Sequence, residues 1–475
     1  MTALSVISAA RESPRRLAVV DGSRHIDFGE LAERVRERIR VLSPLTEAGG
    51  NRSTLVALLT DERLATLEIL LALIELECPF VPLHPRLTPL EREALLARLP
   101  VAWVISAGAS ELTIERRGCF RDAFSSALLE RAPQLAALAT SGSSGPPQVA
   151  LLSRDAFTAA AAASAANLGW LHTDRWLLCL PVAHVGGLSV LTRCLIARRA
   201  VVLVSPRPEL SSSERLAEAI REGEPSLISM VPTQLSGLLE LEPRVSLPSR
   251  VRAILTGGAA AGPRLLGECA DRGWPVLTSY GLTEACSQVA TQKPGSTNRG
   301  QLGVGVPLRG IDVRIEEGVI HLRGATLLSG YIGGNTPQTF SAQAGFRTSD
   351  LGRFDAQGNL HVLGRVDDLI ISGGENVAPW DVEAVLATCP GVLEACVFGV
   401  PDARWGEVVA AALRTEAASS EEVLRRVEQM SRDRLAGFKR PRLYACVSRF
   451  AQGKTGKLDR RATARDVLKQ LRPSR

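Results

Sequence analysis

Residues 56–83, VALLTDERLATLEILLALIELECPFVPL, contain two short apolar segments on either side of a longer one. Val56–Leu59 and Pro79–Leu83 are typical of buried strands, and Arg63–Glu77 between them is typical of a helix. A helix that joins two buried strands is the unit from which parallel sheets with two covered faces are built. The stretch therefore predicts an α/β fold.

The same alternation continues through most of the chain. We predict further strands at residues 101–105, 176–180, 200–204 and 251–255, joined by helices. These segments imply a large N-terminal domain with two mostly parallel α/β sheets. From about Gly303 to Val362, short alternating segments with frequent glycine predict an antiparallel, β-rich subdomain.

Turn residues and charges between Gly364 and Asp368 interrupt the strand pattern. A chain of 475 residues is too long for one hydrophobic core, so we place a domain boundary here. Residues 1–365 would form the large domain and residues 366–475 a small α+β C-terminal domain, a common size for a domain.

Composition and charge exclude several classes of protein. Hydrophobic residues make up 45% and charged residues 22% of the chain, and its net charge of +6 includes no block of like charge. We therefore expect no nucleic-acid partner. We also expect no membrane span, because no run of about 18 uncharged apolar residues occurs. Nine cysteines without a CxxC pair, and an N-terminus without an apolar run, favour reduced thiols in a cytoplasmic protein.

Five polar motifs follow one another in a fixed order. They are TSGSSGPP at 140–147, YGLTE at 280–284, RTSD at 347–350, GRVDD at 364–368 closely followed by SGGEN at 372–376, and GKTGK at 453–457. In the first motif, glycines let the backbone approach phosphate, and hydroxyl and N–H groups can bind its oxygens. Taken alone, this loop fits a Ser/Gly-rich linker equally well.

Together and in this order, the motifs resemble those of the adenylate-forming superfamily, which holds acyl- and aryl-CoA ligases, peptide-synthetase adenylation domains and luciferases. The resemblance covers nearly the whole chain. It implies an AMP-forming acid–thiol ligase that uses ATP, Mg²⁺ and coenzyme A. A carboxylic acid attacks ATP to give an acyl-adenylate, and a thiol then displaces AMP. The resemblance also implies a mobile C-terminal domain that rotates about Asp367 between the two steps.

The resemblance assigns roles to single residues. Tyr280 would stack on adenine, Thr283 would bind the α-phosphate, and Glu284 would hold Mg²⁺. Lys457 would bridge the attacking carboxylate and the α-phosphate, stabilising the charge of the transition state. The implied catalytic residues are Lys457, Thr283, Glu284 and His184, and the implied ATP and AMP contacts are Thr140, Ser141, Gly142, Ser143, Ser144, Gly145, Gly257, Gly258, Tyr280, Asp350 and Arg365.

Plainer interpretations exist for several of these residues. Thr283 also fits the N-cap of a helix, which is compatible with the catalytic role. Asp350 and Arg365, each seen alone, fit a surface salt bridge, and a lysine in a glycine-flanked loop is usually solvated. One position departs from the family pattern, because Gln148 stands where a lysine usually follows the phosphate loop. The missing charge predicts weaker ATP binding or slower adenylation, and it leaves open a catalytically silent nucleotide-binding homologue.

Two branches of the superfamily look most similar to the chain, the o-succinylbenzoate–CoA ligases of menaquinone synthesis and the halobenzoate–CoA ligases. Trp405 and the segment FKRP at 438–441 match CoA contacts of the second branch. The implied CoA-binding residues are Gly373, Gly374, Trp405, Phe438, Arg440 and Arg442. The alternative for Trp405 is packing against a following helix. A carrier-protein phosphopantetheine is the alternative acceptor.

The segment PVAHVGGLS at 181–189 matches the border of the acyl pocket in the family. It lacks the aspartate that amino-acid-activating domains carry near this point. Arg193 matches a basic residue of o-succinylbenzoate ligases and could meet the second carboxylate of that acid; an arginine on a helix surface is nearly as good an interpretation. The implied acid pocket consists of His184, Val185, Gly186, Ser189, Arg193 and Thr233. The favoured acid is o-succinylbenzoate, another aryl acid such as a benzoate is the alternative, and the oligomeric state, a homodimer included, is left open.

Overall fold

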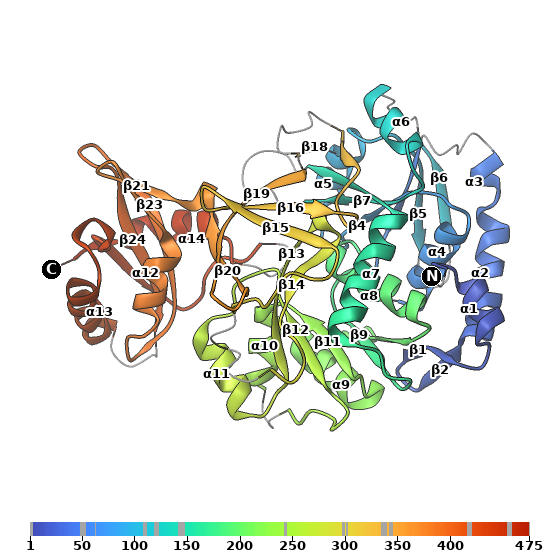
Figure 1. Cartoon of the computed structure of the whole chain (residues 1–475), viewed down its shortest axis with the longest axis horizontal. Coiled ribbons are helices and arrows are strands. Elements are labelled where there is room, and N and C mark those ends of the chain that lie inside the picture. Colours follow the sequence, from blue (N-terminus) through green and yellow to red (C-terminus); the bar gives the residue numbers. More distant parts are fainter. Residues whose placement is uncertain are drawn as a thin grey trace. The chain divides into compact units, whose positions relative to one another are not determined.

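The computed structural model describes residues 3–47, 54–61, 63–107, 112–117, 123–140, 148–241, 245–296, 300, 303–333, 340–341, 345–415, 420–453 and 458–474. The chain, traced in Figure 1, divides into two compact units. The large unit consists of residues 1–258, 268–314 and 321–347, and the C-terminal unit of residues 259–267, 315–320 and 348–475. The predicted domain boundary between residues 365 and 366 stays a prediction.

The large unit contains an eight-stranded sheet. Its strand order is β14 (Ser287–Thr291), β13 (Val276–Leu282), β12 (Ala253–Thr256), β11 (Leu227–Met230), β9 (Arg175–Leu178), β10 (Ala200–Leu203), β1 (Leu17–Asp21) and β2 (Arg24–Asp27). From β13 to β1 all neighbours are parallel, and only the outer strands β14 and β2 pair in the antiparallel sense. The central strands are short and fully buried, as in parallel sheets with helices on both faces.

The large unit also contains a seven-stranded sheet. Its order is β17 (Gly330–Ile332), β8 (Val149–Ser153), β7 (Gln134–Ala139), β4 (Phe80–Leu83), β3 (Leu55–Leu59), β5 (Val101–Ala107) and β6 (Leu112–Arg116). The four strands from β7 to β5 are parallel, and the strands outside them pair in the antiparallel sense.

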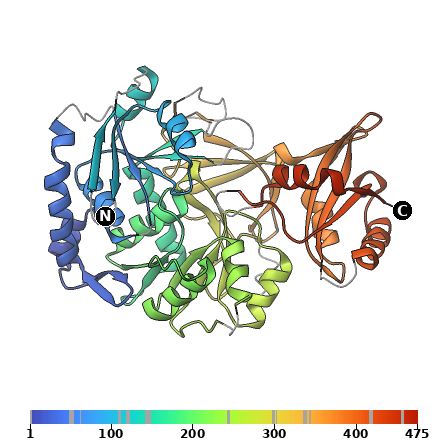
Figure 2. The same ribbon diagram turned by 180° about the vertical axis from the view of Figure 1, so that it is seen from behind.

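Helices cover both sheets and also lie between them. They are α1 (Val6–Glu12), α2 (Phe28–Leu42), α3 (Pro44–Glu47), α4 (Leu64–Glu75), α5 (Pro89–Leu96), α6 (Ala123–Glu130), α7 (Arg154–Leu168), α8 (Val185–Ala197), α9 (Ser212–Gly223) and α10 (Pro232–Leu239), followed by α11 (Pro263–Asp271). The alanine-rich α7 packs against α8 and contacts both β8 and β14, which places it between the two sheets (Figure 2). Among the described residues, no helix combines the length and apolarity that a membrane crossing requires.

Two further sheets follow in the sequence. A five-stranded sheet has the order β15 (Ile311–Glu316), β16 (Val319–Gly324), β19 (Gly345–Phe354) and β18 (Phe340–Ser341), with β20 (Leu360–Arg365) also on β19. After the 3₁₀ helix η3 (Val366–Asp368), a six-stranded sheet has the order β22 (Glu375–Val377), β21 (Ile370–Ser372), β24 (Gly406–Thr415), β25 (Leu443–Val447) and β26 (Arg472–Pro473), with β23 (Val392–Asp402) on β24.

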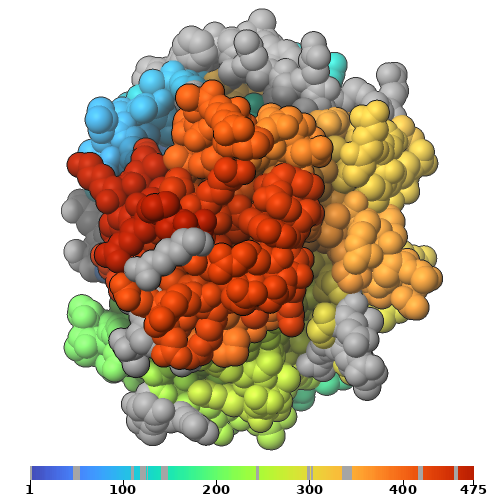
Figure 3. Space-filling model, turned by 90° about the vertical axis from the view of Figure 1, so that its left-hand side faces the viewer, coloured from blue at the N-terminus to red at the C-terminus, as the bar shows by residue number. Residues whose placement is uncertain are grey.

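Helices α12 (Pro379–Leu386), α13 (Ser420–Arg434) and α14 (Arg460–Val467) and the 3₁₀ turns η4 (Gly437–Lys439) and η5 (Leu468–Gln470) accompany the six-stranded sheet. Its core is aliphatic, with Val382, Val397, Val409 and Leu413 at most 1% exposed. Figure 3 shows the surface of this last part of the chain in orange and red. The predicted α/β class is confirmed, including two large sheets, a β-rich sheet and a small α+β part.

Candidate active site

Neighbouring parallel strands of the eight-stranded sheet bring several predicted motifs to one edge. β9 leads to His184 at the N-cap of α8, β11 leads to Thr233 in the first turn of α10, and β12 leads to Gly257 and Gly258. β13 pairs with β12 and carries Tyr280 near its C-terminal end. Because ligands of open α/β sheets bind at the carboxyl ends of the strands, this edge is the candidate site.

Arg193 lies in the middle of α8 and is only 3% exposed. Its guanidinium carbon lies 5.6 Å from the centroid of the Trp176 ring. Within the described part of the chain, its Nε and Nη2 have no hydrogen-bond partner. Burial lowers the pKa of Arg193 to about 10, so the side chain is still a cation at pH 7. The interpretation of Arg193 as a surface arginine is therefore wrong, and its unsatisfied donors suit an anionic ligand.

The rest of the predicted acid pocket surrounds the start of the same helix. Val185 and Gly186 are half-buried, and Ser189, one turn before Arg193, is 1% exposed. Ser189 Oγ also lacks a hydrogen-bond partner among the described residues. A side chain at Gly187 would overlap the carbonyl oxygens of the preceding loop. Because glycine has no side chain, α8 can start close to that loop.

His184 packs against a second histidine that the sequence did not indicate. The ring centroids of His84 and His184 are 5.0 Å apart, with 44° between the ring planes. His84 directly follows β4, and its Nδ1 accepts a hydrogen bond of 3.0 Å from the Arg86 amide. In a neutral His84 the ring proton is therefore on Nε2. The pair joins residues from both sheets of the large unit.

The motif at 280–284 begins inside a strand. β13 runs to Leu282, so Tyr280 and Gly281 belong to it. A side chain at Gly281 would overlap the Ser287 carbonyl, so only glycine allows β14 to pair this closely with β13. Thr283 is the first residue of the 3₁₀ helix η1 (Thr283–Ala285), whose N-cap is Leu282. The prediction that Thr283 is an N-cap is therefore wrong.

Glu284 is held by the segment that contains β17. Tyr331 Oη donates a hydrogen bond of 3.0 Å to Glu284 Oε1, and the Leu328 amide donates one of 2.9 Å to the Glu284 carbonyl. Burial and the nearby charge of Glu284 raise the pKa of Tyr331, so its hydroxyl keeps its proton and remains a donor. The prediction did not include Tyr331.

The described residues include no group of three or more His, Cys, Asp or Glu side chains that could hold a metal ion. Mg²⁺ bound with a nucleotide needs no such group, because it keeps water ligands and takes one or two carboxylates besides the phosphates. A single half-buried carboxylate, with one oxygen fixed by a tyrosine hydroxyl, fits a magnesium ion that arrives with ATP. Glu284 is the residue that would hold it.

The predicted phosphate loop is described only at its two ends. Thr140 follows β7, and its amide donates a hydrogen bond of 2.8 Å to the Gln148 carbonyl. Gln148 directly precedes β8, so this bond closes the base of the loop. The predicted contacts Ser141, Gly142, Ser143, Ser144 and Gly145 lie outside the described residues.

In the C-terminal unit, the two predicted nucleotide contacts lie opposite each other. Asp350 of β19 pairs in register with Arg365 of β20. Arg365 Nη1 lies 3.7 Å from Asp350 Oδ1, and its Nη2 donates to Asp367 Oδ2 over 3.1 Å. Arg365 therefore joins the predicted ribose-binding carboxylate to the predicted hinge residue.

The predicted CoA contacts gather around Trp405. Gly373 and Gly374, both with positive φ, form the turn between β21 and β22, and the Gly373 amide donates to the Trp405 carbonyl over 2.8 Å. The guanidinium carbons of Arg442 and Arg404 lie 4.6 Å and 5.1 Å from the centroid of the Trp405 ring. A strand, β24, follows Trp405, so packing against a following helix does not account for it.

The FKRP segment divides into two environments. Phe438 is 39% exposed in η4, which lies against β22. Arg440 instead donates to the Leu435 and Arg432 carbonyls, over 2.8 Å and 2.9 Å, at the C-terminal end of α13.

Lys457, Lys454, Thr455 and Gly456 lie outside the described residues. The ends of their loop are described. The Asp459 amide donates to the Ala451 carbonyl over 2.9 Å, Gln452 bridges to Leu458, and Asp459 caps α14 through the Ala462 amide. These contacts bring together the two described ends of the segment that contains the predicted catalytic lysine.

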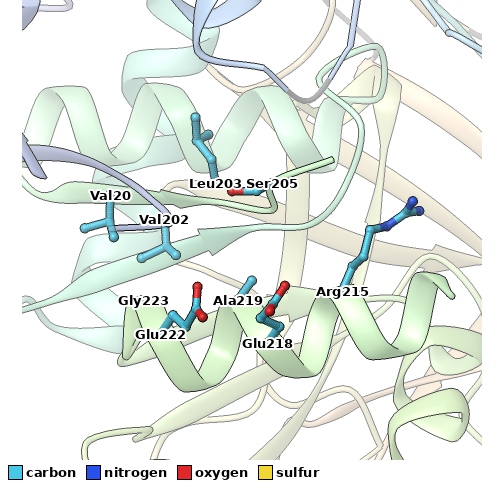
Figure 4. A pocket seen from close by; sticks show the side chains of 10 residues that line it. Val20, Val202, Leu203, Ser205, Arg215, Glu218, Ala219, Glu222 and Gly223 are labelled. Carbon is cyan, nitrogen blue, oxygen red and sulfur yellow. The ribbon is translucent and has the colours of Figure 1, made fainter. Parts of the chain in front are cut away.

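A shallow pocket elsewhere in the large unit shares no residue with the predicted site. It lies beside α9 and is lined by residues such as Val20, Val202, Ser205, Arg215 and Glu218 (Figure 4). Glu218 already pairs with Arg207 over 3.1 Å. Most of its lining residues belong to β1, β10 and α9.

Comparisons with known proteins agree with this geometry. Residues 7–332 match the family model described as AMP-binding enzyme, and residues 381–457 match the AMP-binding enzyme C-terminal domain. The chain is 31% identical over 484 residues to the 2-succinylbenzoate–CoA ligase of Bacillus subtilis, covering 95% of this chain and 96% of that protein.

Two solved structures are also similar to the chain. The B. subtilis o-succinylbenzoate CoA synthetase in complex with its acyl-adenylate intermediate has a TM-score of 0.81 and 28% identity, covering 100% of this chain and 99% of that one. The same enzyme in complex with ATP and magnesium has a TM-score of 0.78 and 29% identity, covering 96% and 98%.

Proposed function

This chain belongs to the AMP-binding enzyme family, and from that premise we propose that it is an ATP-dependent acid–CoA ligase with o-succinylbenzoate as its acid. In the first step, a carboxylate oxygen of the acid attacks the α-phosphorus of ATP and pyrophosphate leaves. In the second step, the CoA thiol loses its proton, its sulfur attacks the acyl carbon, and AMP leaves. Activation is needed because a carboxylate is a poor electrophile.

The observation that carries the choice of acid is the buried Arg193. An acid with one carboxylate loses its negative charge when it becomes an adenylate, and a neutral acyl group gives Arg193 no partner. o-Succinylbenzoate has a second carboxylate that stays charged in both steps. Paired with Nε and Nη2 of Arg193, this carboxylate would satisfy donors that have no partner among the described residues. Trp176 beside the guanidinium would then shield the ion pair from water.

We propose the following roles for the described site residues. Tyr280 stacks on adenine beside Gly257 and Gly258, Thr283 binds the α-phosphate, and Glu284 holds the magnesium ion. When bound, magnesium neutralises phosphate charge as pyrophosphate leaves. His184 borders the acyl group. Thr140 and the phosphate loop, which has no lysine at position 148, bind the β- and γ-phosphates.

The C-terminal unit supplies the remaining roles. Asp350 binds the ribose hydroxyls, Arg365 contacts the nucleotide, and Asp367 is the hinge about which the C-terminal domain turns between the steps. Lys457 stabilises the adenylation transition state, a role that rests on its motif. Trp405 stacks on the adenine of CoA, and the nearby Arg442 meets its phosphates.

Exchange of labelled pyrophosphate into ATP tests the first step. The purified protein should support exchange with o-succinylbenzoate and much less with benzoate or a halobenzoate. With CoA added, the acyl thioester should form, and a loaded carrier protein should replace CoA poorly because it lacks the adenosine end that Trp405 and Arg442 would bind. Absence of exchange with every aryl acid would identify a silent homologue instead.

The cellular setting follows from the same reaction. We propose a cytoplasmic enzyme of menaquinone biosynthesis. The cysteines of the described residues are free, and all but Cys446 are buried, which suits a reducing compartment. Sedimentation of the purified protein would show whether it forms a homodimer.

A further inference from the structure

Tyr331 connects two parts of the proposed ATP site. It lies in β17, which pairs with β8, the strand that begins directly after the phosphate loop. Its hydroxyl donates to Glu284 Oε1 over 3.0 Å, and Glu284 lies in η1 after β13 of the other sheet. Tyr331 is 4% exposed, so water does not compete freely for this hydrogen bond.

The two residues that precede β17 are held by hydrogen bonds to both neighbouring segments. The Leu328 amide donates to the Glu284 carbonyl over 2.9 Å, and the Ser329 amide donates to the Leu151 carbonyl over 2.8 Å. Ser329 Oγ also donates to Gln134 Oε1 over 3.0 Å. The segment is thus tied to η1 and to the β7–β8 hairpin, and the hydroxyl has little freedom to leave the carboxylate.

A carboxylate that is bound through one oxygen has a fixed plane. When Tyr331 occupies Oε1, the carboxylate cannot rotate freely, and the direction of Oε2 is set before a cation arrives. Hydrogen-bonded partners of metal-binding side chains act in this way and influence metal affinity by about 10- to 100-fold. Loss of such a bond would leave the ligand in place and make it less well oriented.

We propose that Tyr331 is a positioning residue. Its hydroxyl orients the Glu284 carboxylate for the magnesium ion of the ATP complex. This inference rests on the proposed function. It adds a residue that does not touch substrate and ties the metal-binding carboxylate mechanically to the strand after the phosphate loop.

Tyr331→Phe tests the inference, because it removes only the hydroxyl. Tyr444→Phe is the matched control: Tyr444 is 2% exposed, and its hydroxyl lies 3.3 Å from Ser431 Oγ in the C-terminal unit. The measurement is Mn²⁺ binding in the presence of a non-hydrolysable ATP analogue, followed by the free-ion signal in electron paramagnetic resonance. We expect Tyr331→Phe to weaken Mn²⁺ binding about tenfold and Tyr444→Phe to leave it unchanged.

A second variant separates positioning from a general loss of structure. In a Glu284→Gln background, Tyr331→Phe should cause no further loss of Mn²⁺ affinity, because the carboxylate through which it acts is gone. The single variant should also need more Mg²⁺ for pyrophosphate exchange and recover its rate at saturating Mg²⁺. Thioester formation from supplied acyl-adenylate should not change.

Equal Mn²⁺ affinity of wild type and Tyr331→Phe would overturn the inference, and so would an equal loss in both backgrounds. If the wild-type protein bound no Mn²⁺ with the nucleotide and catalysed no exchange, the proposed function itself would fail. The two failures are therefore distinguishable.

Discussion

We expect the buried Arg193 to lower the stability of the protein when no acid is bound. A buried guanidinium with unpaired donors loses its hydration and gains little in return, so an apolar side chain of similar length should be tolerated better. Arg193→Met should therefore raise the melting temperature of the ligand-free protein. It should also lower kcat/KM for o-succinylbenzoate by about 100-fold, or about 2.7 kcal/mol, the range for loss of one partner of a buried charge pair.

Melting curves and steady-state kinetics with two acids measure these effects. For benzoate, which lacks the second carboxylate, Arg193→Met should lower kcat/KM much less than for o-succinylbenzoate. An equal loss for both acids would mean that Arg193 supports the fold of the pocket and does not select the acid.

Gln148 is the other residue with a clear energetic consequence. The Gln148 carbonyl accepts the Thr140 amide at the two described ends of the proposed phosphate loop. If that loop binds the phosphates of ATP as proposed, a longer cationic side chain at 148 would start close to them. A charge about 4 Å from a phosphate in water contributes about 1 kcal/mol, so Gln148→Lys should lower the KM for ATP about fivefold. Gln148→Glu should raise it. Both shifts should shrink as salt is added, and a salt-independent change would contradict a charge effect.

Single residues also show what the sequence could not predict. Arg193 was found by its place in a motif, yet it is buried in a helix, α8, that packs against α7 and β14 in the folded chain. Tyr331 and His84 carry no motif of their own. Tyr331 became relevant only because the fold places β17 beside Glu284, and His84 only because it places the end of β4 beside His184.

The starts of three neighbouring parallel strands are cross-linked by one carboxylate. Asp174 precedes β9, Ser226 precedes β11 and Arg252 precedes β12. The side chain of Asp174 is fully buried and accepts hydrogen bonds from the Leu171 amide, from Ser226 Oγ and from two nitrogens of Arg252. Burial alone would raise the pKa of Asp174, and these donors outweigh it, so the pKa lies below the usual value.

This shift gives the stability of the sheet a pH dependence with a definite sign. The unfolded chain takes up the Asp174 proton near pH 3.8, and the folded protein does so only at lower pH. The contribution of Asp174 is therefore complete above about pH 5 and is lost as the pH falls through the folded pKa. Asp174→Asn should lower the free energy of unfolding by about 2 kcal/mol at pH 7, and by progressively less as the pH falls below the ordinary pKa of an aspartate.

Urea unfolding between pH 3 and 7 measures the effect, with Asp312→Asn as a control at an exposed ion pair. A loss for Asp174→Asn that did not depend on pH would show that packing and not charge is responsible.

Strands and helices were predicted well where apolar runs are bounded by turn residues, as at β3, α4 and β4. The extension of β13 to Leu282 and the strand β14 were not predicted, because Tyr-Gly-Leu and Ser-Gln-Val-Ala-Thr are not continuous apolar runs. Their pairing depends on Gly281, which leaves room for the Ser287 carbonyl. Such a contact between adjacent strands has no signature in either segment alone.

At the scale of the whole molecule, the residues proposed for the two steps of the reaction lie in different parts of the sequence. The proposed acid and ATP residues precede residue 333, apart from Asp350, Arg365 and Lys457, and the proposed CoA residues lie between 373 and 442. If each set serves mainly one step, single substitutions should damage one half-reaction and spare the other. Lys457→Ala should abolish acid-dependent pyrophosphate exchange and still convert supplied acyl-adenylate and CoA into thioester, because the lysine acts where two anions meet.

Trp405→Ala should give the opposite pattern. Loss of the aromatic face between two arginines should raise the KM for CoA about tenfold, since stacking on a base contributes about 1–3 kcal/mol, and pyrophosphate exchange should be unaffected. Measured side by side, the two variants form a crossed test. If Trp405→Ala impaired exchange, or if Lys457→Ala impaired thioester formation as much as adenylation, the two steps would share these side chains. One arrangement of the chain would then have to serve both, and no rotation about Asp367 would be required.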